Sequence, residues 1–124
     1  MYSNPINISK IKLNSRRLTN VDLILASVDT PIGLVMNIAQ YALLTHLLAH
    51  VTDMESYEFI WDGGDTHIYL NQLDLIDEQL SREPQPLPKL WLNPGVKDLF
   101  QFTSDDIKIL DYNPLPKIKY PISV

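Results

Sequence analysis

Apolar and polar residues alternate with two different periods along the first half of the chain, and these periods predict a strand followed by a helix. Residues 21–27 form a short aliphatic run, which is typical of a buried strand. The segment DTPIG then interrupts the run, because proline and glycine mark turns. From Asn37 to Asp53, apolar side chains recur mostly every third or fourth residue, which predicts a largely buried helix with Asn37 as its N-cap.

The second half of the chain begins with a strand pattern and continues through shorter elements. Alternating aromatic residues at 57–61 predict a second strand, and the glycine pair at 63–64 within it predicts either a bulge or a close approach of two backbones. Apolar residues at helical spacing in residues 72–83 predict an amphipathic helix, which a proline cluster ends. Three strand-like segments follow, at residues 90–93, 106–112 and 118–124.

The order of these elements predicts an α+β fold of mixed layers, in which a mixed, mostly buried sheet packs against the long buried helix. A chain of 124 residues is about the size of one domain. We therefore expect an N-terminal arm or lead-in at residues 1–20 and a single core at residues 21–124.

Charge and composition exclude several classes of function. The formal net charge is −5 and the pI is near 4.9, which argues against a general nucleic-acid binder that works by phosphate neutralisation. The chain has no cysteine, so a structural disulfide, a thiolate metal site and a cysteine nucleophile are excluded for this chain. No secretory signal pattern is evident and no run approaches the roughly 18 apolar residues of a membrane span, which predicts a cytoplasmic protein without a membrane partner.

Two pairs of residues offer candidate chemistry, and each also has a simpler interpretation. His46 and His50 lie four residues apart on the predicted helix, a spacing at which two imidazoles share a metal. No third ligand is evident nearby in the sequence, so ordinary hydrogen bonds explain them better and we predict no metal site. Arg16 and Arg17 form a compact basic pair that fits a phosphate, or else they belong to a solvated arm.

The segment GGDTHIYLNQ places polar side chains at every second position. If it is a strand throughout, Asp65, His67, Tyr69 and Asn71 share one face, because successive strand side chains alternate sides. A neutral imidazole donates or accepts a hydrogen bond, and a phenol does both. These groups therefore either clamp a hydroxyl-bearing ligand or satisfy a neighbouring loop.

Four segments, in order, resemble motifs from the C-terminal half of the thymidylate synthase family. SVDTPIGLVMNIAQYALL resembles the family's R-S-x-D-x-x-L-G-L-P-F-N-I-A-x-Y-A-L-L, and GGDTHIYLNQ resembles its G-G-D-T-H-x-Y-x-N-H. QLSREPQPLPKL is nearly identical to the corresponding family sequence, and YNPLPKIKYPISV resembles the family's terminal motif. The resemblance covers residues 21–124 and implies a reduced form of the synthase core, which in this family pairs sheet against sheet in a homodimer.

The resemblance also implies two adjacent ligand sites. Asn37 matches the residue that reads the uracil edge of dUMP, whereas His67 and Tyr69 match the pair that holds the deoxyribose 3′-hydroxyl. The stretch NSRRL resembles a motif whose arginines reach a phosphate bound by the dimer partner. The implied dUMP-like site thus comprises Ser27, at a phosphate-contacting position, with Asn37, His67, Tyr69, Arg16 and Arg17. The implied site for 5,10-methylenetetrahydrofolate comprises Asp29, Ile32, Gly33 and, in the closing tail, Tyr112.

Several positions depart from the family pattern. Ala26 replaces the main phosphate-binding arginine, and Gln72 and Leu115 replace motif histidines. The family's P-C-H motif with its cysteine nucleophile is absent from the chain, as is the upstream half of the family sequence. Covalent catalysis in this family requires a thiolate, so the chain is not competent alone and no residue of it is assigned a catalytic role.

Three functional hypotheses follow from these matches and departures. The chain supplies the nucleotide-binding half of a split enzyme, as a homodimer or as a hetero-oligomer with a cysteine-containing synthase chain. Alternatively, it is a non-catalytic nucleotide binder or regulator. The third hypothesis is a structural or interaction protein that reuses the synthase dimer surface, since a chain without its N-terminal layer exposes apolar surface that needs a partner.

Overall fold

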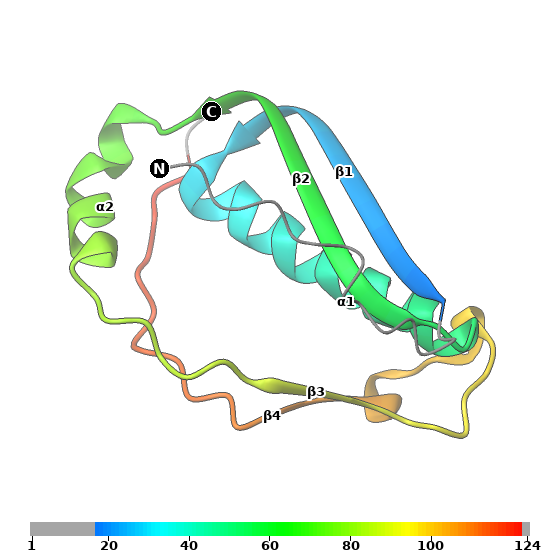
Figure 1. The fold of residues 1–124 in the computed structure, drawn as a ribbon. Coiled ribbons are helices and arrows are strands. Elements are labelled where there is room, and N and C mark those ends of the chain that lie inside the picture. Colours follow the sequence, from blue (N-terminus) through cyan, green and yellow to red (C-terminus); the bar gives the residue numbers. More distant parts are fainter. Residues whose placement is uncertain (1–16, 123–124) are drawn as a thin grey trace, which may run out of the picture.

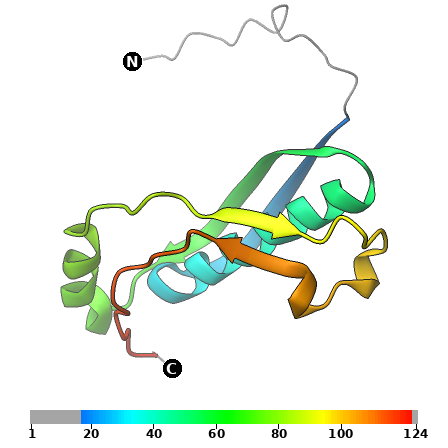
Figure 2. The ribbon, with the colours of Figure 1, turned by 90° about the horizontal axis from the view of Figure 1, so that it is seen from below.

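The computed structural model describes residues 17–122 of the chain, and it confirms the predicted α+β class of mixed layers. Figure 1 shows the long helix α1 lying between two small sheets. Figure 2 shows the same three layers from below, with the β3–β4 hairpin nearest to the viewer. The main elements are the strands β1 (Leu18–Asp29), β2 (Glu55–His67), β3 (Lys89–Leu92) and β4 (Ile107–Leu110) and the helices α1 (Val35–Val51) and α2 (Leu73–Leu80).

Strands β1 and β2 are parallel and form a sheet of their own. Leu23 and Val28 of β1 are buried, whereas Ile24 is 77% exposed. The prediction of a mostly buried sheet is therefore wrong, because in this chain α1 covers only one face of the sheet (Figure 1). A two-stranded parallel sheet with one open face and two open edges is unusual, since parallel sheets are normally covered on both faces.

The glycine pair of β2 permits a close approach of the two backbones and forms no bulge. A Cβ atom at Gly64 would lie 2.9 Å from the carbonyl oxygen of Ala26 on β1, and one at Gly63 would lie 2.3 Å from the Trp61 ring. The strand register continues unchanged past Gly63, and the one register shift of this strand pair lies between Thr19 and Asn20. Of the two alternatives that the sequence left open, the close approach is confirmed.

Helix α1 begins at Val35, directly after a π-helical turn at Thr30–Leu34 (η2). Asn37 is the third residue of the helix, so its prediction as the N-cap is wrong. The residue before the helix, Leu34, is in the αR conformation, so no extended residue separates the turn from the helix. An N-cap residue normally has an extended conformation. The buried residues of α1 are Thr45 and Ala49, and the rest of the helix is half-buried or exposed in this chain.

One helical stretch in the described part of the chain, Thr30–Val51, is long and apolar enough to cross a membrane. This stretch corrects the expectation that no segment approaches a membrane span. The core helix of a globular protein passes the same test, and α1 packs against β1 and β2.

The C-terminal third of the chain contains a hairpin and an extended tail. Strands β3 and β4 are antiparallel, and their register pairs Lys89 with Leu110 and Leu92 with Ile107. The prediction of a last strand at 118–124 is wrong for the described residues 118–122, which have no strand assignment. Pro121 has no N–H for a ladder. The segment is held instead by the Gln72 side chain, which donates to the Pro121 carbonyl oxygen, and by the Tyr120 hydroxyl, which donates to the Leu75 carbonyl oxygen of α2.

Candidate functional site

The candidate site lies where the carboxyl ends of β1 and β2 meet the amino end of α1 (Figure 1). Asp29 and His67 are the last residues of the two strands and are partners in the parallel register. Strand β2 ends at His67, and Leu70–Gln72 then forms a 3₁₀ turn (η3). The predicted strand face through Asn71 is therefore wrong, because the chain turns after Tyr69.

His67 and Tyr69 remain neighbours despite the turn. Their ring centroids lie 4.9 Å apart with an interplanar angle of 81°, an edge-to-face contact that fixes both rings. His67 Nδ1 is buried and has no hydrogen-bond partner in the structure. The nearest carboxylate oxygen, of Asp65, is 3.6 Å away, which is beyond hydrogen-bond distance. The alternative in which a neighbouring loop satisfies this imidazole nitrogen is thus not observed.

Two unsatisfied buried polar atoms lie at this site. Within residues 17–122 the buried side-chain N and O atoms without a hydrogen-bond partner are Asp29 Oδ1, Trp61 Nε1 and His67 Nδ1. A buried polar atom without a partner typically costs about 1–3 kcal/mol. Two of these three atoms belong to the register partners Asp29 and His67. The arrangement suits a ligand that supplies hydrogen bonds at the strand ends.

Gln72 is a site residue that the sequence pattern identified only as a departure from a histidine. Its side chain is fully buried, with 0% relative exposure. The Gln72 Oε1 atom accepts from the Tyr69 backbone N–H at 3.2 Å, and Nε2 donates to the Pro121 carbonyl oxygen at 3.1 Å. It therefore joins the Tyr69 segment to the tail, a pairing between residues 49 positions apart that no local pattern encodes.

Two open clefts adjoin the amino end of α1 and are walled by the tail. The first has a volume of about 660 Å³ and contains Ile32, and the second, of about 460 Å³, contains Tyr112. The structure therefore brings both residues to one region, with shared lining residues Pro31, Val35, Lys117, Ile118 and Tyr120. The space around position 33 does not require a glycine, because an added Cβ would meet only the Asp29 Cβ, at 3.8 Å.

The remaining predicted residues are spread more widely. Ser27 is exposed near the end of β1, and Asn37 is half-buried in the first turn of α1. Arg17 precedes β1, so it lies at the other end of that strand, roughly 30 Å from Ser27 for an extended chain. The structure thus does not bring Arg17 to the phosphate position of its own chain. Arg16 lies outside the described residues.

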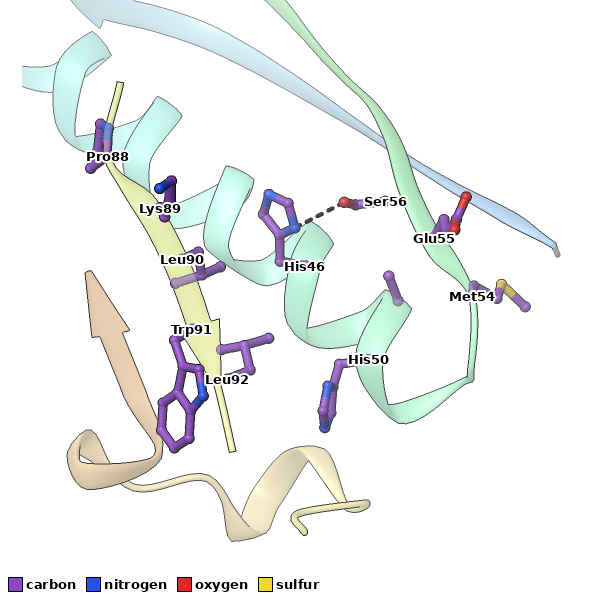
Figure 3. Close-up of a pocket in the computed structure, with 11 residues that line it drawn as sticks. His46, His50, Met54, Glu55, Ser56, Pro88, Lys89, Leu90, Trp91 and Leu92 are labelled. Atoms are coloured by element: carbon purple, nitrogen blue, oxygen red, sulfur yellow. Dashed lines mark hydrogen bonds between the residues drawn. The ribbon is translucent and has the colours of Figure 1, made fainter. Parts of the chain in front are cut away.

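A larger cavity, of about 930 Å³, lies away from the predicted site, between the C-terminal half of α1 and strand β3 (Figure 3). His46 and His50 both face it. His46 Nδ1 lies 2.8 Å from Ser56 Oγ, and His50 Nε2 lies 2.9 Å from the Val96 carbonyl oxygen. The ordinary hydrogen bonds expected for these histidines are confirmed. No cluster of three or more metal-ligating side chains occurs in the described part of the chain.

Comparisons with known proteins place these residues in a family. The family model for thymidylate synthase matches residues 7–124. A curated thymidylate synthase from Leuconostoc mesenteroides is 57% identical over 96 residues, which are 77% of this chain and 30% of the relative. The solved structure of thermostable thymidylate synthase A from Bacillus subtilis matches with a TM-score of 0.83 and 34% identity, over 86% of this chain and 39% of that one.

These matches cover most of this chain but only part of each relative. The chain spans about a third of the length of the curated synthase that it matches. The family model nevertheless covers all of the described residues 17–122. The chain belongs to the thymidylate synthase family.

Proposed function

We propose that this chain is the nucleotide-binding half of a thymidylate synthase-like protein and that it recognises dUMP at the ends of β1 and β2. In this proposal His67 and Tyr69 hold the deoxyribose 3′-hydroxyl, Asn37 reads the uracil edge, and Ser27 contacts the phosphate. Arg17, with Arg16, reaches the phosphate of a dimer partner, which agrees with its position at the far end of β1.

The observation that carries the proposal is the free Nδ1 atom of His67 beside the Tyr69 ring. A sugar hydroxyl both donates and accepts, so it can pair with the imidazole and the phenol together. Because the two rings already contact each other, little side-chain freedom remains to be lost when a hydroxyl binds.

A folate-like ligand fits the neighbouring residues. Asp29 Oδ1 is buried without a partner, and Ile32 lies in the adjoining cleft of about 660 Å³. A carboxylate oxygen beside an apolar wall suits a flat heteroaromatic ring that carries N–H donors. In the family methylenetetrahydrofolate supplies the one-carbon group, and here Asp29, Ile32, Gly33 and Tyr112 would hold it.

Methyl transfer requires more than this chain contains. The chain has no cysteine, so the thiolate must come from another polypeptide segment. The two open edges of the parallel β1–β2 sheet support the same idea, since unpaired strand edges accept further strands. Thymidylate synthases are generally dimeric. We propose a cytoplasmic homodimer or a hetero-oligomer with a cysteine-bearing synthase chain.

Titration of the full chain with dUMP tests the binding proposal. Isothermal calorimetry and the imidazole NMR signals of His67 should both respond, and Tyr69→Phe should weaken binding by about tenfold if its hydroxyl pairs with the sugar. Phe keeps the ring contact with His67, so Tyr69→Phe removes only the hydroxyl. A titration without heat and without a shift at His67 would exclude dUMP recognition at this site.

A structural or interaction protein is the second candidate, and two observations favour it. Ala26 occupies the position of the main phosphate-binding arginine of the family, which weakens any phosphate site. Ile24 is 77% exposed and Ile60 is 44% exposed, so the β1–β2 sheet keeps apolar groups open to a partner. This candidate predicts stable association with a partner chain that is unchanged when His67 is replaced by alanine.

A further inference from the structure

Charge is unevenly distributed along this chain. Residues 18–81, which include β1, α1 and β2, contain ten aspartates and glutamates and no lysine or arginine. Residues 1–17 have the opposite composition, with four lysines and arginines and no acidic residue. Residues 82–124 are nearly balanced, with six basic and five acidic residues. The first segment therefore carries the positive charge that the second segment lacks.

Part of the acidic segment is displayed on the open face of the β1–β2 sheet, opposite α1 (Figure 1). The strand register pairs Asp22 with Ile60 and Ile24 with Asp62, and register partners share one face. Glu58 lies two residues before Ile60, so it shares this face as well. All five side chains are exposed, Ile24 by 77% and Ile60 by 44%. We call these five residues the acidic face.

The three carboxylates of the acidic face have no counter-charge among residues 17–122, where every ion pair joins other residues. The basic side chains described further along the chain have partners elsewhere. Arg82 and Lys89 pair with other carboxylates, and Lys108 lies over the Trp91 ring. The acidic face thus joins exposed apolar surface to uncompensated negative charge. Its occupant should combine apolar side chains with positive charge.

Residues 1–16, which we call the basic arm, have this complementary chemistry. They contain Lys10, Lys12 and Arg16, four apolar side chains within residues 6–13, and no acidic residue. A lysine lays its aliphatic stem on apolar surface while its ammonium group reaches a charged neighbour. Lysines interspersed with isoleucines therefore suit a face on which isoleucines and carboxylates are neighbours.

The basic arm joins the described chain at one end of the same sheet. The Arg17 carbonyl oxygen accepts from the Glu55 backbone N–H at 2.9 Å, which fixes Arg17 where β1 and β2 begin. Asp22 is five residues further along the chain, roughly 17 Å away for a strand. A fully extended segment of sixteen residues spans roughly 50 Å, so a basic arm that turns back reaches the whole acidic face.

We propose that the basic arm binds the acidic face of its own chain, with Lys10 and Lys12 at the carboxylates and the arm's apolar side chains on Ile24 and Ile60. A short connection gives an attached segment an effective concentration on the order of millimolar, which favours the chain's own arm over that of a second copy. A two-fold dimer through the acidic face would place like carboxylates together, because both copies use the same patch. A partner chain at this face must therefore displace the arm.

Paramagnetic relaxation in the full chain tests this contact. Because the chain has no cysteine, Ser9→Cys provides a single attachment site for a spin label on the basic arm. We expect the amide NMR signals of residues 22–24 and 58–62 to lose most of their intensity. Signals of the β3–β4 hairpin, which lies across α1 from the sheet, should keep theirs (Figure 1). Chemical reduction of the label gives the reference intensities.

Exchange of charges tests the pairing. Lys10→Glu with Lys12→Glu places like charges together and should restore most of the lost intensity, as should Asp22→Lys with Asp62→Lys. The chain with all four substitutions should lose the intensity again, because its charges are exchanged but remain opposite. Lys97→Glu, in the exposed loop after β3, is the matched control and should restore nothing. The amide spectrum of each variant establishes that it is folded.

Three results would overturn the proposal. Full intensity of residues 22–24 and 58–62 beside the oxidised label would exclude binding of the basic arm to the acidic face. An equal loss in a mixture of spin-labelled chain and isotope-labelled chain without a spin label would assign the contact to a second copy. Losses that neither charge reversal reduces would exclude the charge pairing. The inference goes beyond dUMP recognition, since none of these results depends on whether the chain binds a nucleotide.

Discussion

Histidines near the two ends of helix α1 differ in their hydrogen bonding. At the C-terminal half, His46 and His50 each have a hydrogen-bond partner, Ser56 Oγ and the Val96 carbonyl oxygen, respectively. Near the amino end, His67 has a buried Nδ1 atom without a hydrogen-bond partner, and the Asp65 carboxylate lies 3.6 Å from it. Buried polar groups in native proteins are usually hydrogen-bonded, so the unsatisfied His67 nitrogen needs an explanation, and the proposed ligand supplies one.

The cavities at the two ends of α1 also differ, and the larger cavity lies at the end whose histidines are satisfied. The cavity of about 930 Å³ lies beside the satisfied histidines (Figure 3). The cleft at Ile32 is smaller, at about 660 Å³. Volume alone therefore does not identify the candidate ligand site. The proposed site rests instead on the unsatisfied polar atoms at the strand ends.

The largest expected effect on stability concerns the strand ends of the candidate site. Gly64→Ala places a Cβ 2.9 Å from the Ala26 carbonyl oxygen, which moves only if β1 moves. We expect a loss of about 2–3 kcal/mol in the free energy of unfolding, measured by urea denaturation. Gly33→Ala is the matched control, since its Cβ has 3.8 Å of space, and it should be neutral or stabilising by up to about 1 kcal/mol. Equal losses in both variants would show that the strands tolerate the extra atom.

At the opposite end, His50→Ala should lower stability without changing nucleotide binding. The substitution removes the contact with the Val96 carbonyl oxygen and an edge-to-face contact with Phe102, whose ring centroid is 5.6 Å away. The expected loss is about 1–2 kcal/mol in thermal or chemical unfolding. A weakened dUMP affinity in a folded His50→Ala protein would remove the distinction between the two ends.

His46→Ala should have a smaller effect of the same kind. Its bond to Ser56 is exposed, so water replaces either partner at little cost, and the loss should stay near 0.5 kcal/mol. Ser56→Ala provides the other half of a double-mutant cycle, which isolates the pair. A loss above about 2 kcal/mol for either single variant would mean that this end holds a buried network.

The smallest effect concerns pH and lies in the loop before β4. Hydrogen bonds from the Asn93 side chain, and then from Thr103, lower the pKa of Asp106 below 3.8. The folded form therefore binds this proton less readily than the unfolded chain, so the stabilisation is complete above pH 3.8 and is lost as the pH falls through the lowered pKa. Asp106→Asn should thus show a shallower decline of Tm below pH 4 than the wild type, and identical slopes would contradict the assigned bonds.

Local sequence patterns predicted which elements form, but they did not predict how those elements are buried and connected. The strand and helix periods predicted β1, α1, β2 and α2, because each period reflects one element's own geometry. They did not predict the open face of the β1–β2 sheet, because burial depends on how distant elements pack and not on local periodicity. The N-cap expected at Asn37 failed for a related reason, since the turn at η2 joins the helix directly.

The sequence indicated the neighbouring rings of the candidate site but not its long-range hydrogen bonds. His67 and Tyr69 stand in a motif of the family, and their contact follows from two positions of spacing. The sequence indicated Gln72 only as a departure from a histidine of the family motif. Its partner Pro121 lies 49 residues away, and no local pattern predicts that contact. Long-range hydrogen bonds of this kind become evident only when the tail is placed beside α2.

The most direct test of the account compares dUMP binding by three full-length chains in one calorimetric series: wild type, His67→Ala and His46→Ala. We predict measurable binding to the wild type, a loss of about tenfold or more in His67→Ala, and wild-type affinity in His46→Ala. Circular dichroism of each variant establishes that it is folded. Equal affinities of the wild type and His67→Ala, or no binding by the wild type, would contradict the claim that the unsatisfied histidine marks the nucleotide site.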